Sequence, residues 1–401
     1  MDEAWRPVSA PAGGGDGPWQ RSRTPQQPDW RHHRELGRVV GELAAAPPLV
    51  SADDVRDLRR RLARVAAGEA MLLQAGDCSE DIADISPPDT LRKIRALDAL
   101  ARRMERATGR AVLRVGRMGG QFAKPRSLPH ESVGGRELPV FRGHMVNSEE
   151  ATERARAHDP RRMLLAYRAS AEVIARLDRV RRADRTPRPG PWCSHEALVL
   201  DYEGALTRWD GPAGGRYLAS THLPWIGERT RRPDGAHARL LASVANPVGC
   251  KIGPSATPDD VAALCAVLDP DRLPGRLVLI ARMGADLVGH RLEPLVRRVR
   301  AAGHPAIWLC DPMHGNTRVT RAGLKVRRLD DMVAEAVRAR RVLEELGVPV
   351  GGLHLETAAR PVTECLGGDI VSEEQVGERY ESLCDPRLNA DQARRLIDAW
   401  A

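Results

Sequence analysis

The chain has 401 residues, of which 42% are hydrophobic and 29% charged, and its formal net charge is +8. This composition is ordinary for a soluble globular enzyme. No apolar run reaches the ~18 residues of a membrane-spanning helix, and the first residues lack a signal-peptide pattern. An odd number of cysteines, seven, argues against a disulfide framework. We therefore expect a cytoplasmic protein with no membrane partner.

The positive charge is carried by arginine far more than by lysine, and it is spread over helical stretches such as DDVRDLRRRLARVAAG. Aromatic residues make up only 3% of the chain, too few for the stacking platforms on which proteins bind single-stranded nucleic acid. We expect no nucleic-acid partner. The charge more plausibly aids solubility or draws anionic substrates toward a cleft.

The first 33 residues are rich in Pro, Gly and Gln, so we expect residues 1–33 to form a flexible N-terminal arm. We expect residues 34–401 to form a single catalytic domain that begins with helices. Periodic apolar residues predict helices over 34–45 and over 52–67, the second with Ser51 as its N-cap. A strand over 70–74, a helix over 89–108 and a strand over 111–115 follow.

Strands and helices then alternate to the end of the chain. A long, glycine-rich loop over 117–148 has little periodicity and is expected to be functional because of its length. A helix over 160–182 follows, with further helices over 258–267 and 329–346. The strand-plus-loop units are 197–203 (ALVLDYE), 248–255 (VGCKIGPS), 276–286 (RLVLIARMGAD), 306–317 (AIWLCDPMHGNT) and 350–356 (VGGLHLE). This alternation predicts a (β/α)8 TIM barrel with an N-terminal extension.

Four polar segments, far apart in the chain, each carry one good metal ligand. These ligands are Cys78, His314, Glu356 and Asp385. A barrel of parallel strands brings such strand-end residues together at its C-terminal rim. A thiolate, an imidazole and two carboxylates suit a catalytic divalent ion better than a closed structural zinc site. We also expect Cys384, which precedes Asp385, to lie near Cys78.

A second set of charged residues occupies the strand-end loops. It consists of Arg117, Lys124, Glu228, Arg229, Lys251 and Arg282. Lys251 and Arg282 each interrupt an apolar strand, which is costly unless an anion or a carboxylate pairs with them. Each cation alone is equally compatible with a structural ion pair, but several at one rim indicate a clamp for phosphate and carboxylate groups. Beside a divalent ion, this clamp predicts carbon–carbon bond formation or cleavage on phosphorylated small molecules. We expect no nucleotide cofactor, because no strand is followed by a phosphate-binding or dinucleotide-binding glycine motif.

The chain resembles the type II (plant-type) 3-deoxy-D-arabino-heptulosonate-7-phosphate (DAHP) synthases. The matching segments run from residue 26 to residue 393 and include QQPDW, LLQAGDCSED, VGRMGGQFAKPRS, SHEALVLDYEGALTR, WIGERTRRPDGAH, NPVGCKIGPS, CDPMHGNT and RYESLCDPRLNADQA. The resemblance implies condensation of phosphoenolpyruvate with erythrose 4-phosphate, the first step of the shikimate pathway. It also implies a homo-oligomer, a dimer or larger.

The resemblance further implies a role for each site residue. Cys78, His314, Glu356 and Asp385 would bind Mn²⁺ or Co²⁺. Arg117, Glu228, Arg229, Lys251 and Arg282 would line the phosphoenolpyruvate site, with Lys124 close to the reacting centre, and Arg126 and Ser127 would hold the sugar phosphate. A metal-bound water, Glu228 and Lys251 are all candidates for moving protons.

Feedback-regulated relatives often carry extra helices in the segment between Lys124 and Glu228, which is compact in this chain. We therefore expect a weakly feedback-regulated enzyme of the kind that supplies secondary metabolism. Two alternatives stay open. One is a related synthase that uses an amino-substituted sugar phosphate, and the other is a non-catalytic partner of another pathway enzyme.

Overall fold

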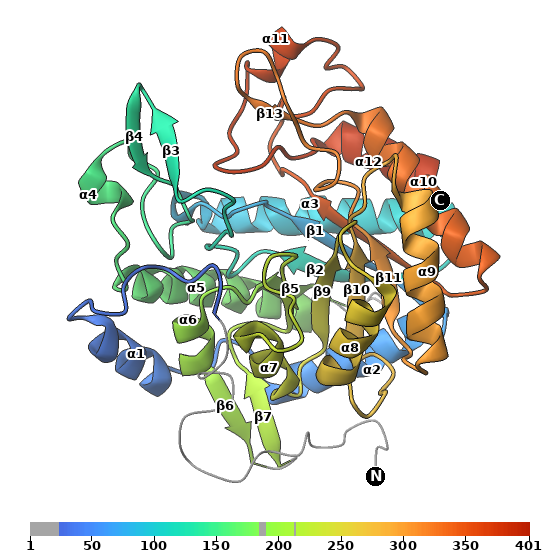
Figure 1. Ribbon diagram of the computed structural model, residues 1–401, viewed down its shortest axis with the longest axis horizontal. Coiled ribbons are helices and arrows are strands. Elements are labelled where there is room, and N and C mark those ends of the chain that lie inside the picture. Colours follow the sequence, from blue (N-terminus) through green and yellow to red (C-terminus); the bar gives the residue numbers. More distant parts are fainter. Residues whose placement is uncertain (1–23, 184–189, 212–213) are drawn as a thin grey trace.

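The computed structural model describes residues 24–183, 190–211 and 214–401, and its centre is a closed barrel of parallel strands (Figure 1). Each strand of the barrel pairs in parallel with two neighbours, and the predicted TIM barrel is confirmed. In spatial order the strands are β1 (Ala70–Gly76), β14 (Val350–Glu356), β11 (Ile307–Cys310), β10 (Leu277–Ala281), β9 (Val248–Ile252), β8 (Leu223–Ile226), β5 (Trp192–Glu196) and β2 (Ala111–Arg117).

Helices surround the barrel, and two of the three small hairpins, β3–β4 and β6–β7, project from it on opposite sides (Figure 1). The helices are α1 (Leu36–Ala45), α2 (Ala52–Ala66), α3 (Pro87–Thr108), α4 (Glu153–Arg156), α5 (Arg162–Ala183), α6 (Leu200–Ala205), α7 (Ala236–Ala242), α8 (Pro258–Leu268), α9 (Val288–Ala301), α10 (Leu329–Glu345), α11 (Glu373–Val376) and α12 (Ala390–Trp400), with a short 3-10 turn at Ile82–Asp84. The hairpins are β3 (His130–Val133) with β4 (Arg136–Pro139), β6 (Thr207–Asp210) with β7 (Gly215–Leu218), and β12 (Arg318–Val319) with β13 (Lys325–Val326). None of the helices among the described residues has both the length and the apolar character needed to cross a membrane.

The two faces of each barrel strand have different neighbours. Side chains alternate along a strand, so Cys250 and Ile252 of β9 pack outward against the helices while Lys251 between them turns into the barrel. In the same way, Leu353 and Leu355 of β14 belong to the outer core, and Glu356 lies inside. The alternation explains why charged residues interrupt otherwise apolar strands.

The N-terminal end of the barrel is filled by apolar side chains. Leu58 and Leu62 of α2 pack there against residues that lie near the starts of the barrel strands, such as Leu72 and Trp192. Ser51 caps α2 by accepting a hydrogen bond from the backbone N–H of Asp54, as predicted. This apolar packing closes the end of the barrel that lies opposite the strand-end loops.

One predicted strand is wrong. The segment 197–203 is not a strand: β5 ends at Glu196, and α6 begins at Leu200. A short apolar run has no periodicity that separates a buried strand from a buried helix. The true strand, WCSHE, carries polar residues because it lies inside a closed barrel, and this hides its strand character in the sequence.

Residues 24–33, which the sequence assigns to the arm, pack against the barrel in this structure. Trp30 is 4% exposed and belongs to a core cluster with Phe122 and Val199. Its indole N–H donates to Asp201 at 2.8 Å. The rest of the arm, residues 1–23, lies outside the described residues.

A substitution at Gly352 would test the close approach of the backbones of β1 and β14. The φ angle of Gly352 is 133°, and a β-carbon there would overlap the carbonyl oxygen of Leu72 on the paired strand. We expect Gly352→Ala to lower the free energy of unfolding by about 2–4 kcal/mol, since it adds backbone strain and forces two strands apart. Gly41→Ala is the matched control, because Gly41 lies in α1 with open space around it. It should change stability by no more than about 1 kcal/mol, in the stabilising direction. Equal denaturation midpoints for the two variants would contradict the close approach.

Candidate active site

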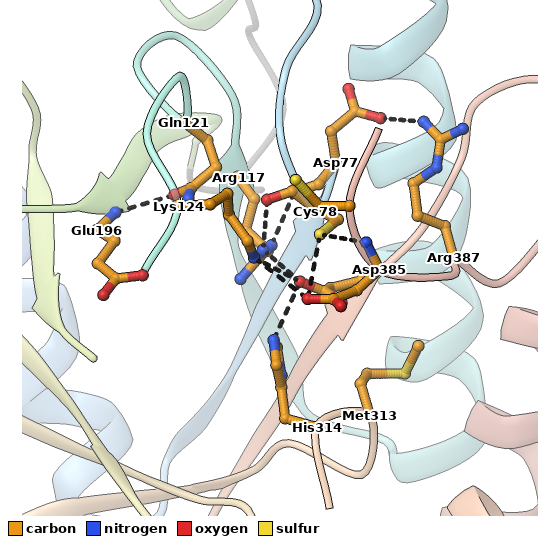
Figure 2. A network of polar contacts seen from close by, with 12 residues as sticks. Asp77, Cys78, Arg117, Gln121, Lys124, Glu196, Met313, His314, Asp385 and Arg387 are labelled. Atoms are coloured by element: carbon orange, nitrogen blue, oxygen red, sulfur yellow. Dashed lines mark hydrogen bonds and ion pairs between the residues drawn. The ribbon is translucent and has the colours of Figure 1, made fainter. Parts of the chain in front are cut away.

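The four predicted metal ligands come together at the C-terminal end of the barrel. One ligand atom each from Cys78, Glu356 and Asp385 lie within 4.8 Å of one another. The imidazole Nε2 of His314 is 3.2 Å from Oε1 of Glu356. Figure 2 shows the Cys78 thiol, Asp385 and His314 directed toward this point. Cys384 belongs to the same small cluster as Cys78, so the expected proximity of the two thiols is confirmed.

Asp311 orients the histidine. Its carboxylate is fully buried, and its Oδ2 lies 2.7 Å from Nδ1 of His314. A carboxylate at Nδ1 fixes the ring so that Nε2 faces the cluster, which is the usual arrangement behind metal-binding histidines. The same Oδ2 atom contacts the ammonium of Lys251. Asp311 therefore links the ligand cluster to the cationic half of the site.

Glu356 is surrounded by cations. Arg117 donates to its Oε1 at 2.8 Å and Arg327 to its Oε2 at 2.8 Å, and all three side chains are at most 1% exposed. Burial alone would raise the pKa of the Glu356 carboxyl. The neighbouring positive charges, those of His314, Lys124 and Arg327 foremost, outweigh it and hold that pKa well below its usual value. Glu356 is thus a permanent buried anion.

The chemistry of this cluster fits a divalent cation. The Cys78 thiol donates to Oδ2 of Asp385 at 3.7 Å, so a thiol and a carboxylate, two groups that bind divalent ions, face each other. Two ammonium groups already lie on the carboxylates: Lys325 is 2.6 Å from Asp385, and Lys124 is 3.6 Å from Glu356. Burial raises the pKa of the Cys78 thiol well above its usual value, and a bound cation would favour the thiolate.

Beside the cluster lies a cavity of about 260 Å³. The structure brings nearly all the predicted substrate-binding residues to its wall, together with two of the ligands. The lining residues are Arg117, Lys124, Pro125, Glu196, Trp225, Gly227, Glu228, Arg229, Lys251, Arg282, His314 and Asp385. Arg117 both binds Glu356 and faces this cavity, so the two halves of the site share a residue.

Two cations of the cavity wall, Arg282 and Lys251, differ in how the protein pairs them. Arg282 donates to the carbonyl of His314 at 2.8 Å, but its Nε is buried without a hydrogen-bond partner among the described residues. Burial, assisted by nearby Arg117, lowers the pKa of Lys251 to about 8, although Asp311 favours the charged form. Buried donors that lack partners are expected where an anionic ligand completes the site.

Glu228 organises the loops of the cavity. Its carboxylate accepts hydrogen bonds from the backbone N–H of Gly253 at 2.6 Å and from Ser255 at 3.2 Å, and it pairs with Arg231 at 3.0 Å. These contacts join the loop after β8 to the loop after β9. The carboxylate of Glu228 is therefore already engaged by donors on both oxygens.

Arg126 and Ser127 do not line this cavity but an adjoining one of about 250 Å³. The two cavities share Lys124 and Arg229 in their walls. Arg229 donates to the hydroxyl of Ser127 at 2.6 Å, which fixes the boundary between them. The site therefore has two neighbouring compartments with cationic side chains in their walls, and Lys124 stands at their junction.

Sequence reasoning missed several residues of the site. Glu196, at the end of β5, is 8% exposed, and its Oε1 is buried without a hydrogen-bond partner among the described residues. Burial raises the pKa of its carboxyl. A correct placement of β5 would have marked Glu196 as a strand-end residue. Asp311, which follows β11 directly, carried the same signal, whereas Arg327 and Lys325 lie after no barrel strand and gave none.

Comparisons with known proteins agree with this architecture. The model of the class-II DAHP synthetase family matches residues 16–186 and 180–399. A probable phospho-2-dehydro-3-deoxyheptonate aldolase of Pseudomonas fluorescens is 47% identical over 377 residues, which cover 94% of each chain. The phospho-2-dehydro-3-deoxyheptonate aldolase of Streptomyces coelicolor is 39% identical over 425 aligned positions, covering 94% of each chain.

Among solved structures, that of phospho-2-dehydro-3-deoxyheptonate aldolase from Francisella tularensis covers 95% of this chain and 99% of its own. Its TM-score is 0.50 at 14% sequence identity, a likeness that shows the fold alone. The family match and the two relatives span nearly the whole chain. This chain belongs to the class-II DAHP synthetase family.

Proposed function

We propose that the protein is a metal-dependent DAHP synthase. It condenses phosphoenolpyruvate with erythrose 4-phosphate and water to give DAHP and inorganic phosphate. The observation that carries the proposal is the pairing of a mixed thiol, imidazole and carboxylate cluster with an adjacent cavity lined by Arg117, Lys251 and Arg282. Such a site holds a phosphorylated carboxylic acid next to a Lewis acid.

The cationic cavity takes phosphoenolpyruvate in this proposal. Arg282, whose Nε is buried without a hydrogen-bond partner among the described residues, and Lys251, which is paired with Asp311, offer donors to phosphate and carboxylate oxygens. Arg117 and Arg229 supply two further guanidinium groups from the cavity wall. Glu228 contributes by holding the loops of Gly253 and Arg231 in place.

The adjoining cavity takes erythrose 4-phosphate. Arg126 and Ser127 would bind its phosphate, and Lys124, between the compartments, would stand near the reacting carbons. A divalent ion held by Cys78, His314, Glu356 and Asp385 would polarise the aldehyde carbonyl. The enol carbon of phosphoenolpyruvate then adds to the aldehyde, water captures C2, and the hemiketal phosphate releases phosphate.

Glu196 is our candidate for handling a proton of the attacking water. It is the carboxylate in the cavity wall that keeps a buried oxygen without a hydrogen-bond partner among the described residues. Its raised pKa makes it a better proton acceptor than an exposed carboxylate. Glu228, by contrast, has its carboxylate engaged by three donors.

We further propose weak feedback regulation and a role in supplying secondary metabolism. The described residues between Lys124 and Glu228 form barrel strands, the small hairpins β3–β4 and β6–β7, and helices α4, α5 and α6. We also propose a homo-oligomer. The amino-substituted sugar phosphate is the alternative substrate, because only the aldehyde half of the site would have to differ.

The proposal is tested with phosphoenolpyruvate and erythrose 4-phosphate, by following the loss of phosphoenolpyruvate absorbance. We expect consumption that needs both substrates, stops with chelator, returns with Mn²⁺ or Co²⁺, and persists when phenylalanine, tyrosine and tryptophan are added. Cys78→Ser should lose metal content and activity, because a hydroxyl is a weaker ligand than a thiolate. Cys384→Ser, which alters the neighbouring thiol, should retain its metal.

No consumption with any divalent metal would contradict the proposal. The amino-substituted sugar phosphate would be tried next, and failure with both acceptors would leave the non-catalytic partner. Strong inhibition by an aromatic amino acid would remove the proposed weak regulation and leave the activity standing.

Lys251 gives a pH prediction. Its pKa of about 8 means that it is charged below pH 8 and loses its charge as the pH rises above that value. Binding an anion requires the charged form, so the KM for phosphoenolpyruvate should be level below pH 8 and rise by up to about tenfold per pH unit above it. Lys251→Arg keeps its charge at these pH values, and its KM should stay level. A wild-type KM that does not change up to pH 9.5 would show that the charge of Lys251 does not bind the substrate.

Glu196→Gln tests the proton-handling role. The amide keeps the size of the side chain but cannot accept a proton, so we expect kcat to fall about 10²-fold. The KM for phosphoenolpyruvate should change by less than about threefold. Glu228→Gln is the comparison, because weakening the loop contacts should raise that KM more than it lowers kcat. Wild-type kcat in Glu196→Gln would assign the proton transfer to another group.

A further inference from the structure

The segment Gln26–Trp30 lies across two active-site loops and has no assigned role. The carbonyl oxygen of Gln26 accepts a hydrogen bond from the side chain of Arg142 at 2.6 Å. Its side-chain Oε1 accepts from the backbone N–H of Arg126 at 2.9 Å, and from Arg142 at 3.3 Å. Gln26 thus accepts three hydrogen bonds. One comes from the loop that carries Lys124, Arg126 and Ser127, and two come from Arg142.

Arg142 transmits this contact to Lys124. The backbone N–H of Lys124 donates to the carbonyl oxygen of Arg142 at 2.9 Å. Arg142 is therefore held by Gln26 through its side chain and holds Lys124 through its backbone. Gln26 reaches Arg126 directly and Lys124 through one intermediate residue.

The backbone of Gln26 is itself unusual. Its φ angle is 65°, in the left-handed region, which only two non-glycine residues adopt among the described parts of the chain. This conformation costs a side-chain-bearing residue free energy and persists where surrounding contacts require it. The strained residue is the one whose side chain reaches the loop. The strain is therefore located at the contact.

The neighbouring residues hold the segment in place. The side chain of Gln27 donates to the carbonyl oxygen of Leu198 at 2.9 Å and accepts from the backbone N–H of Leu200 at 3.0 Å. These contacts tie the segment to the loop that follows Glu196. Trp30 packs in a buried cluster with Phe122 and Ala123, the two residues before Lys124. The segment is therefore anchored both to the chain that follows Glu196 and to the residues just before Lys124.

We propose that Gln26 is a positioning residue for the sugar-phosphate compartment, where it fixes the loop 124–127 so that Arg126, Ser127 and Lys124 meet a phosphorylated aldehyde. The inference rests on the proposed function for the identity of that ligand. Gln26 lines neither cavity, so it acts through the loop and not by touching the substrate. Its effect should fall on the aldehyde substrate and spare phosphoenolpyruvate, whose cavity is built mainly on barrel strands and the loops after β8 and β9.

The test compares Gln26→Met, which keeps the size of the side chain but removes the acceptor, with Gln26→Glu, which keeps an acceptor. We expect Gln26→Met to raise the KM for erythrose 4-phosphate about tenfold, because it removes the acceptor of the 2.9 Å hydrogen bond from Arg126 and of the longer one, at 3.3 Å, from Arg142. The KM for phosphoenolpyruvate should change by less than about twofold. Thr24→Ala, a change at an exposed residue two positions before this segment, should leave both constants at their wild-type values.

Hydrogen–deuterium exchange at the Arg126 amide gives a readout that needs no activity. It should speed up about tenfold in Gln26→Met and stay at the wild-type rate in Gln26→Glu, which retains the acceptor. A wild-type KM for erythrose 4-phosphate in Gln26→Met, or an equal rise in both KM values, would overturn the positioning role. If the wild-type protein does not condense the two substrates, the proposed function fails. Exchange at Arg126 then still decides whether Gln26 fixes the loop, and an unchanged rate in Gln26→Met overturns it.

Discussion

The buried carboxylate of Glu356 is the charge on which the site depends. It is 0% exposed, and an unpaired carboxylate there would cost several kcal/mol. Arg117 reaches it from the end of β2, and Arg327 reaches it from the segment just before α10. Each arginine is as buried as the carboxylate, so each charge is acceptable only while the others are present. Parts of the chain more than 200 residues apart are thereby fixed around one point.

This constraint sets the positions of the other groups. Oε1 of Glu356 also lies 3.2 Å from His314 and 3.6 Å from Lys124, so the carboxylate that anchors the two arginines faces the ligand cluster as well. Asp311 is a second buried carboxylate that contacts several groups of the site, because its Oδ2 contacts both His314 and Lys251. Two buried carboxylates thus hold an imidazole in one orientation between them. Preorganisation of this kind lets a site bind a charged ligand without first rearranging.

The sequence predicted the barrel and the grouping of Cys78, His314, Glu356 and Asp385, because both follow from local patterns. Parallel strands place their carboxyl ends together, so a polar residue directly after an apolar run has a predictable location. The packing of residues 24–33 was not predictable in this way. Gln27 and Trp30 are held by hydrogen bonds to residues about 170 positions away, and no periodicity in a ten-residue segment indicates such partners.

Glu196 was missed for a related reason. The strand that carries it, WCSHE, points Ser194 and Glu196 into the polar end of the barrel, and the apolar run that follows it forms a buried turn and α6. Strand prediction from hydrophobicity fails where both faces of a strand are buried but one of them is chemically active. Arg327 was missed for a different reason. Arginine is common on helix surfaces in this chain, and nothing in the local sequence marks Arg327 as buried.

Arg117 connects the two halves of the site electrostatically. On one side it is bound to Glu356 at 2.8 Å, and on the other it lines the cationic cavity with Lys251 and Arg282. A cation at the ligand cluster would weaken the attraction of Glu356 for Arg117 and leave more of the guanidinium charge for an anion in the cavity. An anion in the cavity would in turn accept a hydrogen bond from the buried Nε of Arg282 and favour the charged form of Lys251. Because free-energy coupling between two ligands is reciprocal, a metal and an anionic substrate bound at these two places would favour each other's binding through the same arginine.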